Sequence, residues 1–234
     1  MKFLEFDKTR DFPFYNENPK MSKIGWLVLL LSIPVAFLIS ALSAEIIPSD
    51  IVTSFVLCMV MLIPLLYFSN WNYKLMFRKP TRNEIILAVL MFIGYLIYSA
   101  VVSYGLDMMG LSGVTNTPEN AGVSVESTIG LVFSLMGEEL IKFIPLMFLM
   151  RVVYKFSNNR KLAIVISTVL VMIGFGLLHY DPPYLTLASV LALQGMGTIF
   201  EMYGYLKTKN IFVPYISHLL TDALFFIIIL MGIG

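Results

Sequence analysis

Two adjacent glutamates and a lysine interrupt a long apolar stretch at Glu138-Glu139-Leu140-Ile141-Lys142. An ionisable side chain at bilayer depth is costly, so its presence there is a sign of function. Glu138 and Lys142 are four residues apart and share one helical face, whereas Glu139 points about 100° away. A nearby lysine would help to keep Glu138 ionised, as a general base requires. The alternative is a structural ion pair between helices, for which two adjacent acids are more than is needed.

The only two histidines, His179 and His218, lie in or beside apolar stretches. His179 precedes an Asp-Pro-Pro turn, so an anchor at the membrane interface is the alternative to a catalytic role. His218 and Asp222 are four residues apart and share a helical face. They form either a hydrogen-bonded pair of buried groups or a donor pair directed at developing negative charge, as in an oxyanion hole.

The composition excludes a soluble globular protein. The chain of 234 residues is 58% hydrophobic and 13% charged, against about 25% charged in soluble domains. Its single cysteine, Cys58, lies in an apolar run, so it forms no intrachain disulfide and no cysteine-type zinc cluster. The first 23 residues are polar and the apolar run after them is too long for a signal peptide, so we expect no cleavage. We expect the lipid bilayer as surroundings and no nucleic-acid partner.

Apolar runs long enough to span a bilayer predict an all-α, polytopic helical bundle. We expect a cytoplasmic segment over 1–23 and one transmembrane domain over 24–234. The seven predicted spans are 24–47, 51–69, 84–106, 127–150, 162–180, 184–206 and 211–231. Segment 1–23 is either a tether or lies on the inner membrane surface, and the 107–126 loop is expected to contain a short helix from Pro118.

The basic residues predict the orientation of these spans. Every Lys and Arg except Lys142 falls before the first span or in every second connection after it, whereas the other connections carry acids and no bases. Basic loops stay in the cytoplasm, which predicts the N-terminus inside and the C-terminus outside.

Three separate spans thus carry polar groups that a bilayer disfavours, and each becomes tolerable if it faces the others across a wet cavity. At about 1.5 Å per residue, Glu138 and Asp222 lie at similar heights, His218 lower and His179 higher. The spread of roughly ten Å requires tilted helices or a fifth span that starts earlier. We expect Glu201 on the sixth span to be structural and to pair with Lys142 or Lys207.

In this order, the three elements resemble the CAAX-protease and bacteriocin-processing family, also called the Abi family. Its pattern is Glu-Glu-x-x-x-Arg, then Phe-x-x-x-His, then His-x-x-x-Asn or Asp. The corresponding segments here are Glu138-Glu139-Leu140-Ile141-Lys142, Phe175-Gly176-Leu177-Leu178-His179 and His218-Leu219-Leu220-Thr221-Asp222. The resemblance covers about 125–231.

The family includes the type II CAAX prenyl endopeptidases, which are glutamate-dependent intramembrane proteases. The resemblance implies that Glu138 activates a water with His179 as its partner. It places His218 and Asp222 at oxyanion-stabilising positions, with Glu139 and Lys142 supporting the site. Lys142 in place of arginine loses the bidentate fork, and an ionised Asp222 would repel an oxyanion, so Asp222 is either protonated or orients His218.

We therefore expect a cofactor-independent endopeptidase in a cell membrane, most simply a bacterial plasma membrane, that cleaves a membrane-associated peptide or protein such as a pheromone or bacteriocin precursor. One alternative is a non-proteolytic immunity or scaffold protein. Another is a metal-dependent variant in which Glu138, Glu139, His179 and His218 bind zinc. A transporter or proton relay also uses buried Glu and His, although the sequence shows no inverted repeat.

Overall fold

The computed structural model describes residues 10–113 and 122–232, and these residues are almost entirely helical. The long helices are α1 (Lys23–Ile46), α2 (Asp50–Phe68), α3 (Arg82–Met108), α4 (Val125–Ser157), α5 (Arg160–Leu178) and α8 (Phe212–Leu230). In all of these helices except α8, the N-cap side chain accepts a hydrogen bond from a first-turn N–H, which fixes where the helix begins. These N-cap residues are Ser22, Ser49, Thr81, Ser124 and Asn159.

Five of the described helices are long and apolar enough to cross a membrane, namely α1, α2, α3, α5 and α8. The prediction of an all-α, multi-pass membrane protein is therefore confirmed. Helix α4 has 33 residues but carries the charges of the Glu138–Lys142 segment, so composition alone does not identify it as a span. The total of seven spans and their orientation in the membrane remain predictions.

The sixth predicted span, 184–206, is not one regular helix. The structure has a short helix α6 (Leu187–Ser189), a π-helix η3 (Val190–Met196) and helix α7 (Ile199–Thr208). Close backbone contact explains the irregularity, because a Cβ placed on Gly176 of α5 would lie 2.8 Å from the Val190 oxygen and 2.9 Å from the Gly195 Cα. The two backbones therefore pack closely at these glycines, and this packing accompanies a widened helix rather than a straight one.

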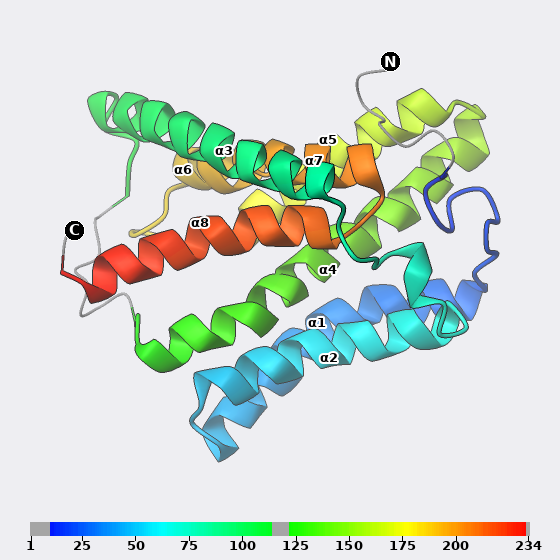
Figure 1. The fold of residues 1–234 in the computed structure, drawn as a ribbon, viewed down its shortest axis with the longest axis horizontal. Helices are drawn as coiled ribbons and strands as arrows, with labels where there is room; N and C mark the ends of the chain where they lie inside the picture. The colour runs from blue at the N-terminus through cyan, green and yellow to red at the C-terminus, as the bar shows by residue number, and fades with distance from the viewer. Residues whose placement is uncertain (1–9, 114–121, 233–234) are drawn as a thin grey trace.

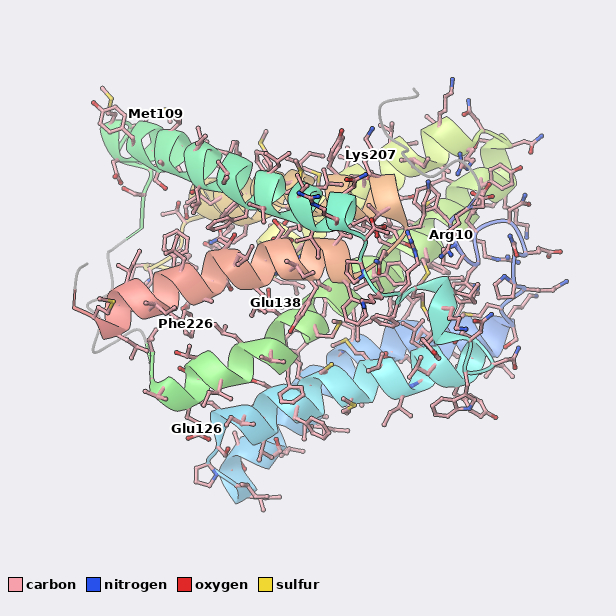
Figure 2. All side chains as sticks on the ribbon, viewed as in Figure 1. Arg10, Met109, Glu126, Glu138, Lys207 and Phe226 are labelled. Carbon is pink, nitrogen blue, oxygen red and sulfur yellow. The ribbon has the colours of Figure 1, made fainter. Side chains whose placement is uncertain are left out.

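Helix α4 packs against the α1–α2 hairpin on one side and against α5 and α8 on the other, while α3 covers α7 and α8 (Figure 1). It runs obliquely to α8 in this view. Figure 2 shows Arg10 and Lys207 at one end of the bundle, Met109 and Glu126 at the other, and Glu138 between them. This arrangement agrees with the separation of basic and acidic connections along the sequence.

The N-terminal segment is not a free tether where the structure describes it. Phe12, Phe14, Tyr15 and Met21 are buried in the main hydrophobic cluster. Burial and a hydrogen bond to Asp11 raise the pKa of Tyr15 to about 12. The short helix expected from Pro118 lies outside the described residues.

Candidate active site

A cavity of about 190 Å³ lies among α3, α4, α5, η3, α7 and α8, and most of its wall is polar. Four of its lining residues are the predicted catalytic residues Glu138, His179, His218 and Asp222. The structure therefore brings side chains from three distant stretches of sequence to one cavity. The expected difference in height does not keep these side chains apart, since all four line this cavity, and α4 runs obliquely to α8 (Figure 1).

His218 lies at the centre of this group. Its Nε2 is 3.7 Å from Glu138 Oε2 and 3.8 Å from Asp222 Oδ2. The side chains of Glu138 and Asp222 are 27% and 31% exposed, whereas that of His218 is 10% exposed. The two carboxylates thus face the open part of the cavity and the imidazole lies behind them.

His179 follows the last residue of α5 and lines the same cavity. Its Nδ1 lies 2.9 Å from the carbonyl oxygen of Phe175, one helical turn earlier. A hydrogen bond from Nδ1–H to this carbonyl would leave Nε2 as the proton acceptor. The Phe175 ring also packs on the imidazole, with ring centroids 4.8 Å apart.

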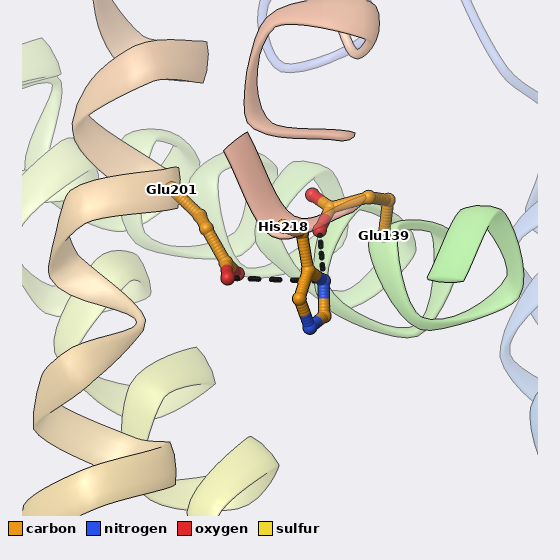
Figure 3. A group of neighbouring side chains, drawn as sticks. All are labelled: Glu139, Glu201 and His218. Atoms are coloured by element: carbon orange, nitrogen blue, oxygen red, sulfur yellow. Dashed lines mark hydrogen bonds and ion pairs between the residues drawn. The ribbon is translucent and has the colours of Figure 1, made fainter. Parts of the chain in front are cut away.

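Behind the cavity lies a buried cluster of charged residues around Lys142. The Lys142 Nζ is 2.6 Å from Glu139 Oε1 and forms a second ion pair with Glu201. Figure 3 shows Glu139 and Glu201 on either side of His218, whose Nδ1 lies 3.0 Å from Glu139 and 3.7 Å from Glu201. The Lys142 ammonium also lies 4.7 Å from the centroid of the Phe175 ring.

This cluster corrects one expectation and bears out another. Lys142 was expected to support Glu138, but its ion pairs are with Glu139, three residues earlier, and with Glu201. The family pattern has its arginine four residues after the second glutamate. In this chain that position is Phe143, whose ring packs on that of Tyr205, and Lys142 lies one residue earlier. The expected Glu201–Lys142 pair is present, and it joins α7 to α4.

The set of side chains that could hold a metal also differs from the expected one. In the described part of the chain, Glu139, Glu201 and His218 have ligand atoms within 4.8 Å of one another, whereas Glu138 and His179 are not in this group. The Lys142 ammonium contacts both carboxylates and lies 3.5 Å from His218 Nδ1. These residues do not fit a metal ion, because a protonated lysine already provides the cation.

The lining residues without a catalytic role in the sequence analysis include Tyr95, Gln194 and Glu201. The side-chain Oε1 of Gln194 is buried without a hydrogen-bond partner. Glu201 is an acid within an apolar run, so the same reasoning that indicated Glu138 could have indicated Glu201 as a site residue. Nothing in the sequence indicated Tyr95, because tyrosine is common in membrane proteins.

Part of the chain is similar to a known protein family. Residues 121–224 match the family model described as type II CAAX prenyl endopeptidase Rce1-like. No curated protein and no solved structure matches the chain. The matched segment is similar to this protease family, and it contains all four residues predicted to be catalytic.

Proposed function

We propose that this protein is an intramembrane endopeptidase that hydrolyses a peptide bond in a membrane-associated peptide or protein. The family match supports a CAAX-type protease of the membrane. The observation that carries the proposal is the approach of Glu138 and Asp222 to one ring nitrogen of His218 at the mouth of a polar cavity. A bilayer gives no reason to collect these groups, because each alone is unfavourable in lipid.

In this proposal, Glu138 is the general base that activates a water for attack on the scissile carbonyl, with His179 as its partner. Both side chains line the cavity, whose volume of about 190 Å³ has room for water beside a peptide bond. Proton transfer from water to Glu138 supplies hydroxide to the carbonyl carbon, and the same proton is then available for the leaving amine.

His218 would stabilise the negative oxygen of the tetrahedral intermediate. Its Nε2 faces the cavity, while Nδ1 lies next to Glu139. If Nδ1 donates to Glu139, Nε2 can donate to an oxyanion only when the ring carries both protons. Asp222, 3.8 Å from Nε2, then orients the ring or acts in its neutral form.

The test compares membrane-derived peptides from cells that produce the wild type with those from cells that produce Glu138→Gln. This change preserves the volume of the side chain and removes the base. The matched control is Glu126→Gln, on the exposed first turn of the same helix. We expect one or more fragments to disappear in Glu138→Gln and to persist in the control.

Fragments that form at the wild-type rate in Glu138→Gln would contradict the proposal. The immunity or scaffold alternative predicts a different pattern. In that case, Glu138→Gln and His179→Ala would both retain the cellular phenotype at normal expression, and no fragment would depend on either side chain.

A further inference from the structure

Gln194 lines the candidate active site, and the mechanism proposed above does not use it. It is the only glutamine of the chain and lies in the π-helix η3. Its side chain forms no hydrogen bond with any residue that the structure describes, and its Oε1 is buried. A buried carboxamide oxygen without a donor destabilises a folded protein. A structural role would be served by a partner within the protein, so the unpaired carboxamide at this cavity indicates a role toward a bound molecule.

The backbone around Gln194 is held in place from several sides. Its carbonyl oxygen accepts a hydrogen bond from the Thr198 hydroxyl. The Tyr98 hydroxyl of α3 donates to the Ala192 carbonyl oxygen at 2.7 Å, and Gly195 packs closely on the backbone of α5. Short π-helical segments are frequent at functional sites. A side chain on such a fixed backbone is preorganised for binding.

The wall of the cavity is rich in hydrogen-bond acceptors. It contains the carboxylates of Glu138, Glu201 and Asp222. The hydroxyls of Thr198 and Thr221 donate to carbonyl oxygens one turn earlier in the chain, so both are already engaged. A peptide bond that enters this cavity brings carbonyl oxygens that lose their hydrogen bonds to water and need a donor.

Two of the described lining residues have a neutral donor without a hydrogen bond to the protein, namely Gln194 and Tyr95. With Nδ1–H donated to the Phe175 carbonyl, the Nε2 of His179 is an acceptor and is not a third. Gln194 differs from Tyr95 in that its oxygen end is buried, which leaves its NH2 end for the cavity. A carboxamide N–H binds a carbonyl oxygen and adds no charge beside the carboxylates.

We infer that the Gln194 carboxamide binds the main chain of the substrate, with its NH2 group donating to a substrate carbonyl oxygen inside the cavity. This inference rests on the proposed endopeptidase function and adds a substrate-binding residue to it. It also defines the bound segment of the substrate. That segment is extended or unwound, because a helix uses its carbonyl oxygens for its own hydrogen bonds.

The test makes two measurements on Gln194→Met, which keeps the length of the side chain and removes its polar atoms. The first is thermal unfolding of the purified full-length protein in detergent without substrate. The unfolding temperature should rise by about 2–4 °C, because the unpaired oxygen is gone. The second is cleavage of a substrate identified through the Glu138→Gln comparison. Its kcat/KM should fall about 10- to 100-fold, because a substrate carbonyl loses its donor.

Two further variants serve as a discriminating variant and a control. Gln194→Glu keeps the size of the side chain and its acceptor oxygens but lacks the NH2 donor, so its kcat/KM should fall as it does in Gln194→Met. Leu191→Met is the matched control, because Leu191 lies in the same π-helix and outside the cavity lining. It should retain the unfolding temperature and the kcat/KM of the wild type.

A lower unfolding temperature of Gln194→Met would overturn the inference, because it would show that the side chain has a structural role. Wild-type kcat/KM in either Gln194→Met or Gln194→Glu would overturn it too, and loss of cleavage in Tyr95→Phe alone would assign the donor to Tyr95. Fragments that are lost in Glu138→Gln but form normally in Gln194→Met would refute the substrate contact and leave the protease proposal intact. Fragments that do not depend on Glu138 would refute the protease proposal, and the inference would fall with it.

Discussion

The Nδ1 atom of His218 lies 3.0 Å from Glu139 Oε1, and this contact turns the opposite ring nitrogen toward the cavity. The two adjacent glutamates therefore lie in different surroundings: Glu139 is buried against the imidazole and Lys142, and Glu138 lies at the cavity. A pair that looks redundant in the sequence has two distinct positions in space.

Glu139→Gln is expected to lower kcat by about 10- to 100-fold, by analogy with residues that orient a metal ligand through a hydrogen bond. KM should change little, because Glu139 does not line the cavity. The peptide comparison between the wild type and Glu138→Gln would first identify a substrate. Steady-state kinetics on that substrate would then measure kcat and KM separately, with the exposed Glu45→Gln as control. A raised KM with unchanged kcat would show instead that Glu139 acts in substrate binding.

Lys142→Met is expected to destabilise the protein by about 3–5 kcal/mol, because it leaves Glu139 and Glu201 buried without their cation. Adding Glu201→Gln removes one of the two unpaired charges and should recover part of that loss. Thermal unfolding in detergent measures both changes, and the exposed Lys79→Met should have an effect within about 0.5 kcal/mol. Strict additivity of Lys142→Met and Glu201→Gln would mean that the ion pair contributes nothing.

Lys142→Ala is expected to create a zinc site from Glu139, Glu201 and His218, whose ligand atoms lie within 4.8 Å of one another. Zinc at 100 times its Kd would then stabilise the variant by about 2.7 kcal/mol, reversibly on chelation. The wild type should gain nothing, because its lysine occupies the cation position. The control is Lys142→Ala with His218→Ala, which lacks a ligand. Equal stabilisation of the wild type by zinc would restore the metal-dependent alternative.

Gly176→Ala is expected to impair folding and activity, because the added Cβ would meet backbone atoms of Val190 and Gly195 at 2.8 and 2.9 Å. Backbone cannot move aside as a flexible side chain does, so η3 and the cavity wall must shift. Gly174→Ala on the same helix is the matched control, since nothing lies within 4 Å of its added Cβ. Comparison of unfolding temperature and fragment formation would test this, and equal behaviour of the two variants would contradict it.

The bounds of α1, α2, α3, α5 and α8 could be predicted from the sequence to within two residues because apolar length fixes them. Helix α4 continues to Ser157, beyond the predicted end at 150. Four residues of the cavity wall could be predicted because Glu138, His179, His218 and Asp222 are polar groups in apolar surroundings. The partner of Lys142 could not, since positions three and four residues earlier both lie within its reach. The choice depends on Glu201, which a different segment brings to the same place.

The break in the sixth segment could not be predicted either. Its residues are mostly apolar, and the irregularity arises where Gly195 meets Gly176 of another helix. The burial of the N-terminal segment escaped prediction for a similar reason. Its aromatic residues show no helical or strand period, and their partners lie far along the chain.

Those distant partners impose an order on assembly. The Phe12 ring lies 6.0 Å from that of Tyr205, and Lys209 lies 5.4 Å from the Phe12 ring. Phe12 thus acquires these two neighbours only after α7 has been synthesised. Until then, the Phe12 ring lacks these contacts, and an interruption of synthesis before α7 would leave it without them.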